Sequence, residues 1–118
     1  MNNFRRKIFL LLTIITLSSN SNATSGNDLI KKINAFKYFY SENAIPSNVD
    51  FIEVAKFMSY VDATADTSIL FNILCSNQHI TKQQMYFTVV KYFDANPHRW
   101  HDPASLLIIE SLNDAFCK

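Results

Sequence analysis

Two histidines in the stretch NPHRWH are the first candidates for chemistry. His98 and His101 form an HxxH pattern, and imidazole is a common zinc ligand. In the zinc motif of metalloproteases the two histidines are four positions apart and a glutamate follows the first, and this pattern has neither feature. A zinc site also needs three or four converging ligands. We therefore expect a polar turn here and no metal.

A second candidate is a thiol nucleophile with its base, formed by Cys75 and His79. No third group that would orient the histidine is recognisable, and the leader described below predicts export, which favours disulfides over free thiols. Glu53 and Glu110 form no recognisable acid–base pair. We therefore expect a protein that is not an enzyme and that needs no cofactor.

The only two cysteines of the chain stand at the ends of a predicted helical hairpin. Its helices are expected over residues 81–95 and 102–116, with residues 96–101 as the turn. In an antiparallel hairpin the start of the first helix lies beside the end of the second, which brings Cys75 to Cys117. Two cysteines in a small exported domain typically form a disulfide, so we predict one between them.

The first 23 residues have the pattern of a cleaved signal peptide. Residues 5–7 are basic and residues 8–17 are mostly apolar. Ser21 and Ala23 then place small residues where signal peptidase requires them. About ten apolar residues are too few to cross a bilayer, which takes about twenty. Cleavage is therefore expected rather than anchoring, and residues 1–23 are predicted to be removed.

The remaining domain, residues 24–118, carries 8 basic and 10 acidic side chains, a net charge of −2. Nucleic acids and anionic membranes select clustered cations, so neither is expected as a partner. Gly26 is the only glycine of the chain. Tight hairpin turns and phosphate-binding loops both rely on glycine. The chain is therefore predicted to be all-α, a small four-helix domain with one disulfide.

Apolar residues that recur every three or four positions predict two helices before the hairpin. The first is expected to run to about Tyr40, and Ser25 or Asn27 can cap it. The second is expected to run to about Asp66, with a cap just before it begins. Asn48 and Asp50 are the candidates for that second cap. Residues 67–74 are expected to continue this helix or to add a helical turn.

The hairpin helices have stronger start signals. Thr81 and Gln84 have the spacing of a capping box, and Asp102 followed by Pro103 predicts a cap and a first-turn proline. The inner faces of the four predicted helices comprise Leu29, Ile30, Ile33, Phe36, Phe39, Tyr40; Phe51, Val54, Ala55, Met58, Val61; Met85, Val89, Tyr92, Phe93; Leu106, Ile109, Leu112, Ala115 and Phe116.

Trp100, the only tryptophan, lies between Arg99 and His101 in the predicted turn. Tryptophan and arginine are the residues most enriched at binding hot spots. His98, Arg99, Trp100 and His101 are therefore predicted to bind a protein partner. The alternative is that Trp100 folds back to close the end of the bundle. An apolar helix face left exposed by so small a core could also pair two copies of the chain as a homodimer.

The amino-acid sequence of the hairpin resembles that of the Rap/Tai family of periplasmic immunity proteins, which protect bacteria from type VI secretion amidase toxins. The stretch that carries the resemblance is VVKYFDANPHRWHDPASLLIIESLNDAFC. The positions that match the family pattern are Gln84, Val89, Val90, Lys91, Tyr92, Phe93, Pro97, Arg99, His101, Pro103, Ala104, Leu112, Ala115, Phe116 and Cys117, preceded by Asp28, Leu29, Ile30, Tyr60, Ala63, Asp66 and Cys75. Many members have a second cysteine pair, where this chain has Ile33 and Phe57. The proline before the final cysteine is absent.

The resemblance implies a periplasmic protein that binds a peptidoglycan amidase and blocks its active site without a cofactor. The expected contact regions are the turn at residues 96–101 and the exposed face of the first helix. Two alternatives stay open. One is an acid-stress chaperone of the Hde type, also small, helical and joined by one disulfide, for which the three histidines offer a partial trigger. The other is an envelope protein without inhibitory activity.

Overall fold

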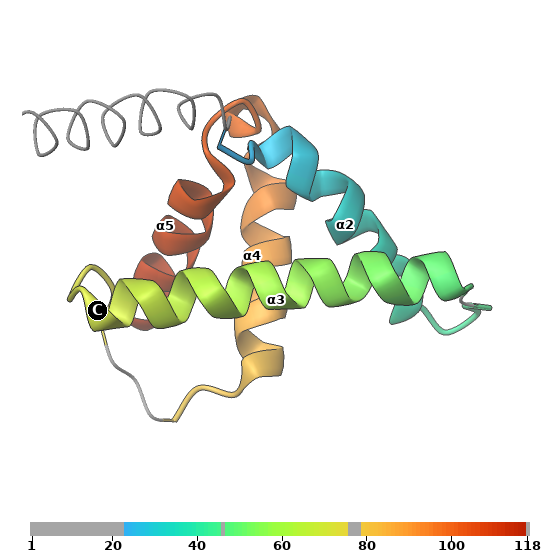
Figure 1. Ribbon diagram of the computed structural model, residues 1–118, viewed down its shortest axis with the longest axis horizontal. Helices are drawn as coiled ribbons and strands as arrows, with labels where there is room; N and C mark the ends of the chain where they lie inside the picture. Colours follow the sequence, from blue (N-terminus) through green and yellow to red (C-terminus); the bar gives the residue numbers. More distant parts are fainter. Residues whose placement is uncertain (1–22, 46, 76–78, 118) are drawn as a thin grey trace, which may run out of the picture.

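The computed structural model describes residues 23–45, 47–75 and 79–117, so nearly all of the predicted signal peptide lies outside the described residues. The described chain forms four α-helices: α2 (Gly26–Phe39), α3 (Asn48–Leu70), α4 (Lys82–Ala95) and α5 (Ala104–Phe116). A 3₁₀ turn, η1 (Pro97–Arg99), joins the last two (Figure 1). No strand is present in these ranges, and the predicted all-α, four-helix domain is confirmed.

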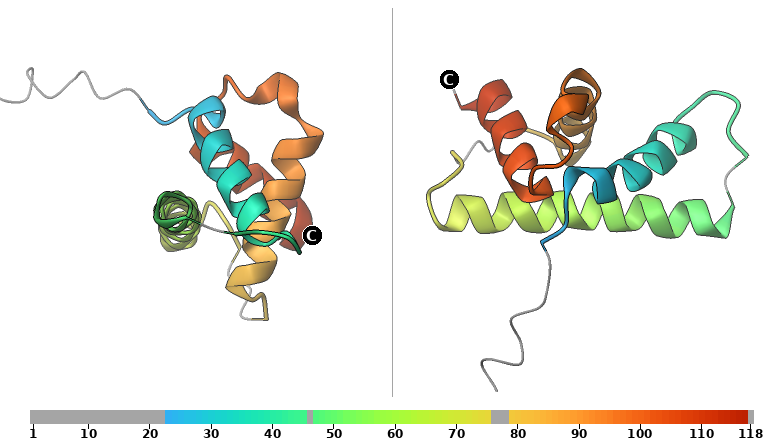
Figure 2. Two further views of the ribbon diagram at one scale, coloured as in Figure 1. Left: turned by 90° about the vertical axis from the view of Figure 1, so that its right-hand side faces the viewer. Right: turned by 90° about the horizontal axis from the view of Figure 1, so that it is seen from above.

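The long helix α3 crosses one side of the other three helices (Figure 1). A view along its axis shows it standing beside them, with one side turned away from the rest of the molecule (Figure 2). Helix α4 and helix α5 run back on each other as the predicted hairpin, and α2 packs most extensively against α3. No helix of the described residues is long and apolar enough to cross a membrane.

Three of the four helices begin with a capping box, in which the cap side chain accepts from the third backbone N–H and the third side chain accepts in return from the cap N–H. The pairs are Ser25 with Asp28, Ser47 with Asp50, and Thr81 with Gln84. The third box is as predicted. For α3 the prediction was wrong by a few positions, because Ser47 is the cap, whereas Asp50 is its reciprocal partner and Asn48 already lies in the helix.

The predicted start of the last helix is wrong. Asp102 does not cap α5, which begins at Ala104 with Pro103 at the cap position and no side-chain cap. The Asp102 carboxylate instead accepts from Arg99 Nε at 2.9 Å. The backbone N–H of Ala104, which has no partner within the helix, donates to the carbonyl of Thr24 at 2.8 Å. The Thr24 carbonyl, at the start of the domain, therefore takes the place of a side-chain cap for α5.

Helix α3 runs one turn past its predicted end at Asp66 and stops at Leu70. Asn72 then takes a left-handed backbone conformation, φ 57°, which asparagine tolerates better than most residues. The N–H groups of Ile73 and Leu74 both donate to the carbonyl of Ser68. Of the two alternatives predicted for residues 67–74, the continuation of the helix is confirmed for residues 67–70, whereas residues 71–74 form a turn that is not helical.

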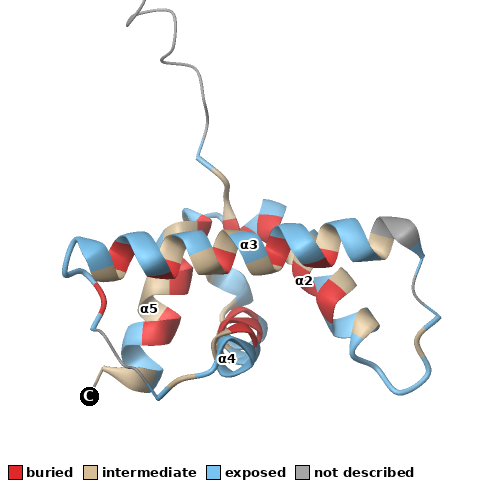
Figure 3. Ribbon diagram, turned by 60° about the horizontal axis from the view of Figure 1, so that its bottom comes forward, coloured by how far each residue is buried: buried red, intermediate tan, exposed pale blue. Residues whose placement is uncertain are grey.

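The core lies where the inner faces of all four helices meet (Figure 3). Its largest fully buried side chains are Phe36, Phe57, Phe93, Leu29, Ile33, Leu107, Ile108 and Leu112. Tyr40, Phe51 and Leu106 were predicted inside but are between 41% and 50% exposed, and Ala55 and Ala115 are exposed too. The buried stripe of α5 is shifted by one position, to Leu107 and Ile108, because α5 must meet both α3 and α4.

Ile33 and Phe57, the two positions that the resemblance matched to a second cysteine pair, lie in α2 and α3. Both side chains are completely buried in the shared core of α2 and α3. Phe57 also contacts the ring of Phe36, with centroids 5.0 Å apart. Burying a side chain of this size contributes roughly 1.5–3 kcal/mol, so these two side chains help to hold α2 and α3 together.

Candidate functional site

The residues predicted to bind a partner all lie in one loop at the top of the molecule (Figure 1). We call residues 96–103 the apical loop; it connects α4 to α5 and contains the 3₁₀ turn η1. Backbone hydrogen bonds from Arg99, Trp100 and Asp102 to carbonyls three residues earlier fold it tightly. Its conformation is therefore set by its own backbone and by the helices around it.

Trp100 turns inward rather than outward. Its indole Nε1 donates to the carbonyl of Phe93 at 2.9 Å, and its partly buried ring packs against the core. The Phe93 carbonyl lies in the last turn of α4, where it also accepts from the N–H of Asn96 at 3.2 Å. Of the two alternatives for Trp100, the structure shows the one in which it closes the end of the bundle.

Arg99 is the centre of a hydrogen-bonded network under the apical loop. Its guanidinium donates to both carboxylate oxygens of Glu110 and, through Nε, to Asp102 at 2.9 Å. The Tyr92 hydroxyl accepts from Arg99 at 3.0 Å and donates to Glu110 at 2.8 Å. One arginine thus joins α4, the loop and α5 with a bidentate fork, a geometry that lysine could not reproduce.

The network shifts the ionisation of its members. Hydrogen bonding from Arg99 lowers the pKa of the Glu110 carboxyl, against an opposing effect of burial. The pKa of the Arg99 guanidinium is raised, chiefly by Glu110 and then by Asp102. Burial and the bond to Glu110 raise the pKa of the Tyr92 phenol. The arginine and the glutamate therefore stay charged at neutral pH, and the tyrosine stays neutral.

Gly26 seats the apical loop on the start of α2. Its N–H donates to the carbonyl of Asp102 at 2.9 Å, and the N–H of Asn27 donates to the carbonyl of Trp100 at 2.7 Å. A Cβ at Gly26 would stand 2.8 Å from the Trp100 oxygen and 2.9 Å from Leu107 Cδ1. Only glycine fits this approach. Sequence reasoning missed this role, although the position of a lone glycine directly after a cap was a visible signal.

His98 and His101 remain on the surface of the loop. His101 Nε2 lies 3.2 Å from Asp102 Oδ1. Among residues 23–45, 47–75 and 79–117, no group of three histidine, cysteine or acidic side chains is placed to hold a metal ion. The exposed positions of α2 begin beside the loop with Asn27, which is bonded to Trp100, and continue along the helix through Lys31 and Asn34.

The family model of Rap1a immunity proteins matches residues 25–117, nearly the whole of the domain. The chain belongs to this family. No curated protein and no solved structure matches it significantly. An immunity protein acts by binding a toxin, so membership implies a toxin partner, and such proteins are generally not enzymes.

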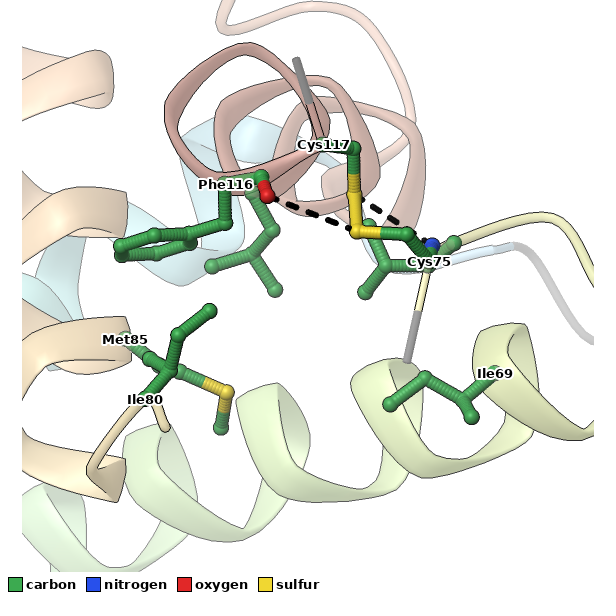
Figure 4. Close-up of a pocket in the computed structure, with 8 residues that line it drawn as sticks. Ile69, Cys75, Ile80, Met85, Phe116 and Cys117 are labelled. Atoms are coloured by element: carbon green, nitrogen blue, oxygen red, sulfur yellow. Dashed lines mark hydrogen bonds between the residues drawn. A yellow bond between two sulfur atoms is a disulfide. The ribbon is translucent and has the colours of Figure 1, made fainter. Parts of the chain in front are cut away.

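In this Rap1a-family protein the disulfide (Figure 4) lies at the C-terminal end of α5, whereas the apical loop precedes the start of that helix (Figure 1). Cys75 and Cys117 are bonded as predicted, with Cα atoms 5.7 Å apart. The N–H of Cys75 also points at Cys117 Sγ, 3.3 Å away. Both cysteines are consumed, so the thiol nucleophile considered for Cys75 does not exist in the oxidised protein.

A small apolar pocket opens beside the disulfide (Figure 4). It is lined by Ile69, Leu74, Cys75, Ile80, Met85, Leu112, Phe116 and Cys117 and has a volume of about 50 Å³. An engineered apolar cavity that binds benzene is about 150 Å³. The pocket is too small for a ligand of that size, and the side chains that line it are all apolar or in the disulfide.

Proposed function

We propose that this Rap1a-family protein is a periplasmic immunity protein that binds a type VI secretion peptidoglycan amidase and inhibits it. The observation that carries the proposal is the family match over residues 25–117. The pattern of residues 1–23 supports export. The Cys75–Cys117 disulfide agrees with an oxidising compartment such as the periplasm.

The proposed contact surface is the outside of the apical loop together with the adjoining exposed residues of α2. His98 and His101 present their imidazoles to the partner, while Arg99 and Trp100 hold the loop from within. A loop ordered before binding loses little conformational entropy in the complex. Inhibition then needs only a surface that fills the toxin's cleft, with a polar rim and no cofactor.

The direct test uses residues 24–118 with the disulfide formed and the amidase-like effector encoded beside the gene. Peptidoglycan stem-peptide cleavage is measured as the protein is added. We expect activity to fall to zero at a stoichiometric ratio. Full activity at excess protein, with no complex on a sizing column, would contradict the proposal. A client-aggregation assay at pH 2–3 would then test the acid-chaperone alternative.

The contact surface has its own test in the double variant His98→Ala/His101→Ala. Both side chains are exposed, so the free energy of unfolding should stay within about 0.5 kcal/mol of wild type. Affinity for the toxin should fall at least about tenfold if the pair lies in the interface. His79→Ala, at an exposed position near the opposite end of α4, is the matched control and should bind like wild type.

The proposed active form is a homodimer. Symmetric dimers are the commonest assemblies of soluble chains, and several large apolar side chains of this domain are more than half exposed. Two of them, Ile52 and Leu70, lie near the two ends of α3, and Phe71 and Ile73 directly follow this helix.

A further inference from the structure

The two cysteines of the disulfide differ in how far they are exposed. Cys75 lies at an exposed position directly after the turn that follows α3, whereas Cys117 is half-buried at the end of α5. Both line the small apolar pocket, where the disulfide and the backbone around it are visible together (Figure 4). An exposed disulfide is open to attack by thiols from solution, so this bond can react while the domain stays folded.

The backbone groups beside the two sulfurs have opposite polarity. The N–H of Cys75 donates toward Sγ of Cys117 at 3.3 Å. The carbonyl oxygen of Phe116 lies 3.6 Å from Sγ of Cys75. The positive end of a backbone dipole therefore faces the sulfur of Cys117, and the negative end of another faces the sulfur of Cys75. The two sulfurs are not chemically equivalent.

This difference decides which sulfur leaves in thiol–disulfide exchange, because one of the two must depart as a thiolate. When Cys117 departs, its negative charge accepts the N–H of Cys75, and a hydrogen bond to a charged group is stronger than one to a neutral group. When Cys75 departs, its charge faces the Phe116 oxygen, which repels it. Both contacts favour the departure of Cys117.

We propose that the disulfide is a directional exchange site, at which an external thiolate attacks Sγ of Cys75 and Cys117 leaves. The attacking sulfur forms a new S–S bond to Cys75 while the Cys75–Cys117 bond breaks, and the electron pair of that bond stays on Cys117. A second external thiolate then attacks the first one and releases Cys75. The chain gains two electrons and takes up two protons from water, and the two external thiolates become one disulfide.

The dipole of α5 does not reverse this preference. A helix C-terminus carries partial negative charge and disfavours a thiolate beside it, and Cys117 follows α5 directly. The two sulfurs are bonded to each other, so this effect is similar at both of them. The N–H of Cys117 also donates to the carbonyl of Asn113 at 3.0 Å, which satisfies one of the carbonyls at that end. The choice between the sulfurs therefore depends on the Cys75 N–H and the Phe116 oxygen.

The same intermediate serves when the bond forms, because a reaction and its reverse pass through the same species. Cys75 precedes Cys117 by 42 residues, so in an exported chain it meets an oxidant first and forms a mixed disulfide. The thiolate of Cys117 then attacks Sγ of Cys75 and releases the external thiol. The order of the cysteines in the chain and their contacts in the folded domain therefore assign the mixed disulfide to the same residue.

The test treats oxidised residues 24–118 with glutathione and stops the exchange at early times with a thiol-alkylating reagent. Mass spectrometry of the digested protein shows which cysteine carries glutathione and which is alkylated. We expect at least about tenfold more glutathione on Cys75 than on Cys117. Equal amounts, or an excess on Cys117, overturn the proposal. The protein unfolded in urea is the matched control, and it should lose the preference because both backbone contacts are lost.

A second arm of the experiment distinguishes a protein thiol from a small one. Thioredoxin that lacks its second cysteine stays bonded to the cysteine that it attacks, and we expect that cysteine to be Cys75. A complex that forms faster than the glutathione adduct at equal thiol concentration assigns the site to protein dithiols, and a slower one assigns it to small thiols. A complex through Cys117 contradicts the proposal. Because no toxin is present, this result is independent of the inhibition assay.

Discussion

At the scale of single residues, Glu110 decides how the apical loop responds to acid. It accepts from Arg99 and from Tyr92 while its side chain is about one-third exposed. Its pKa is lowered from an ordinary value of 4.5 by the hydrogen bond from Arg99. The folded state therefore binds fewer protons than the unfolded state in the range just below that value, and linkage makes folding less favourable as protons are added.

Glu110→Gln removes this dependence. In the wild type, the Glu110 carboxylate should contribute fully to the free energy of unfolding above about pH 5. This contribution should be lost as pH falls through the lowered pKa of Glu110 in the folded state. The variant should be less stable at pH 7 by roughly 1 kcal/mol, a small figure because the pair is partly exposed. The difference between the two proteins should shrink toward pH 3. Urea unfolding at a series of pH values measures it.

The control for that series is Glu42→Gln, which changes an exposed carboxylate in the connection between α2 and α3. It should keep the wild-type profile within error. A Glu110→Gln difference that stays constant from pH 7 to pH 3 would mean that the loss comes from packing and not from the charge of Glu110.

Residue types alone indicated the importance of Arg99 and Trp100 but not the direction in which they point. Both are typical of binding surfaces, and for Trp100 the sequence left open whether the ring is exposed or folds back onto the bundle. Their partners, Glu110 and the Phe93 carbonyl, lie 11 and 7 positions away in different helices. Which donor meets which acceptor depends on how α4 and α5 are rotated about their axes, and periodicity fixes such a rotation only to within about one position.

At the scale of elements, the contact between α2 and the apical loop depends on a missing side chain. In a helix interior, replacing glycine by alanine usually stabilises by roughly 0.5–1 kcal/mol. At Gly26 two backbone atoms of Trp100 stand within 2.9 Å of the new Cβ and cannot rotate away. Helix propensity therefore predicts that Gly26→Ala raises the free energy of unfolding, whereas packing predicts that it lowers it.

We expect packing to prevail. Gly26→Ala should destabilise by roughly 1–3 kcal/mol, the usual cost of overpacking, and should weaken the bonds that α2 makes to the loop. Thermal unfolding measures the first effect, and amide exchange at Asn27 measures the second. Asn34→Ala, at an exposed position of the same helix, should be neutral or slightly stabilising. A stabilised Gly26→Ala would show that the loop moves aside.

Helix starts were predictable from the sequence where capping is local. The capping box at Thr81 was predicted outright, and Ser25 was one of two candidates for α2. The start of α5 was not, because Asp102 has a competing partner in Arg99 and the N–H of Ala104 is satisfied by Thr24, which is remote in sequence. Local patterns describe a helix end only when no tertiary partner competes for the same side chain.

At the scale of the whole molecule, four helices, the hairpin and its disulfide followed from periodicity and cysteine position. The crossing of α3 over the other three helices did not. A helix that packs against several neighbours at once has an inner face that its own period cannot define, and Phe51 was accordingly placed inside when it is half exposed. The same error concealed the uncovered side of α3, which becomes visible only when the fold is assembled.

The disulfide is a covalent cross-link between the segment that follows the long helix α3 and the end of the hairpin. It joins the segment after α3 to the end of α5 across a sequence separation of 42 residues. Closing a loop of that length in the unfolded chain is worth up to about 4 kcal/mol in the chain-entropy model. Cys75→Ser/Cys117→Ser should therefore lower the free energy of unfolding by roughly 2–4 kcal/mol, measured by urea unfolding against the oxidised protein.

The same variant separates stability from recognition, because the disulfide and the apical loop lie at opposite ends of α4 and α5. The contacts of Arg99, Trp100 and Gly26 involve no residue of the disulfide end. Where the variant is still folded, its affinity for the toxin should match wild type, while its inhibition should fail at a lower temperature. Loss of affinity in a fully folded variant would place the toxin's contact at the disulfide end and not at the apical loop.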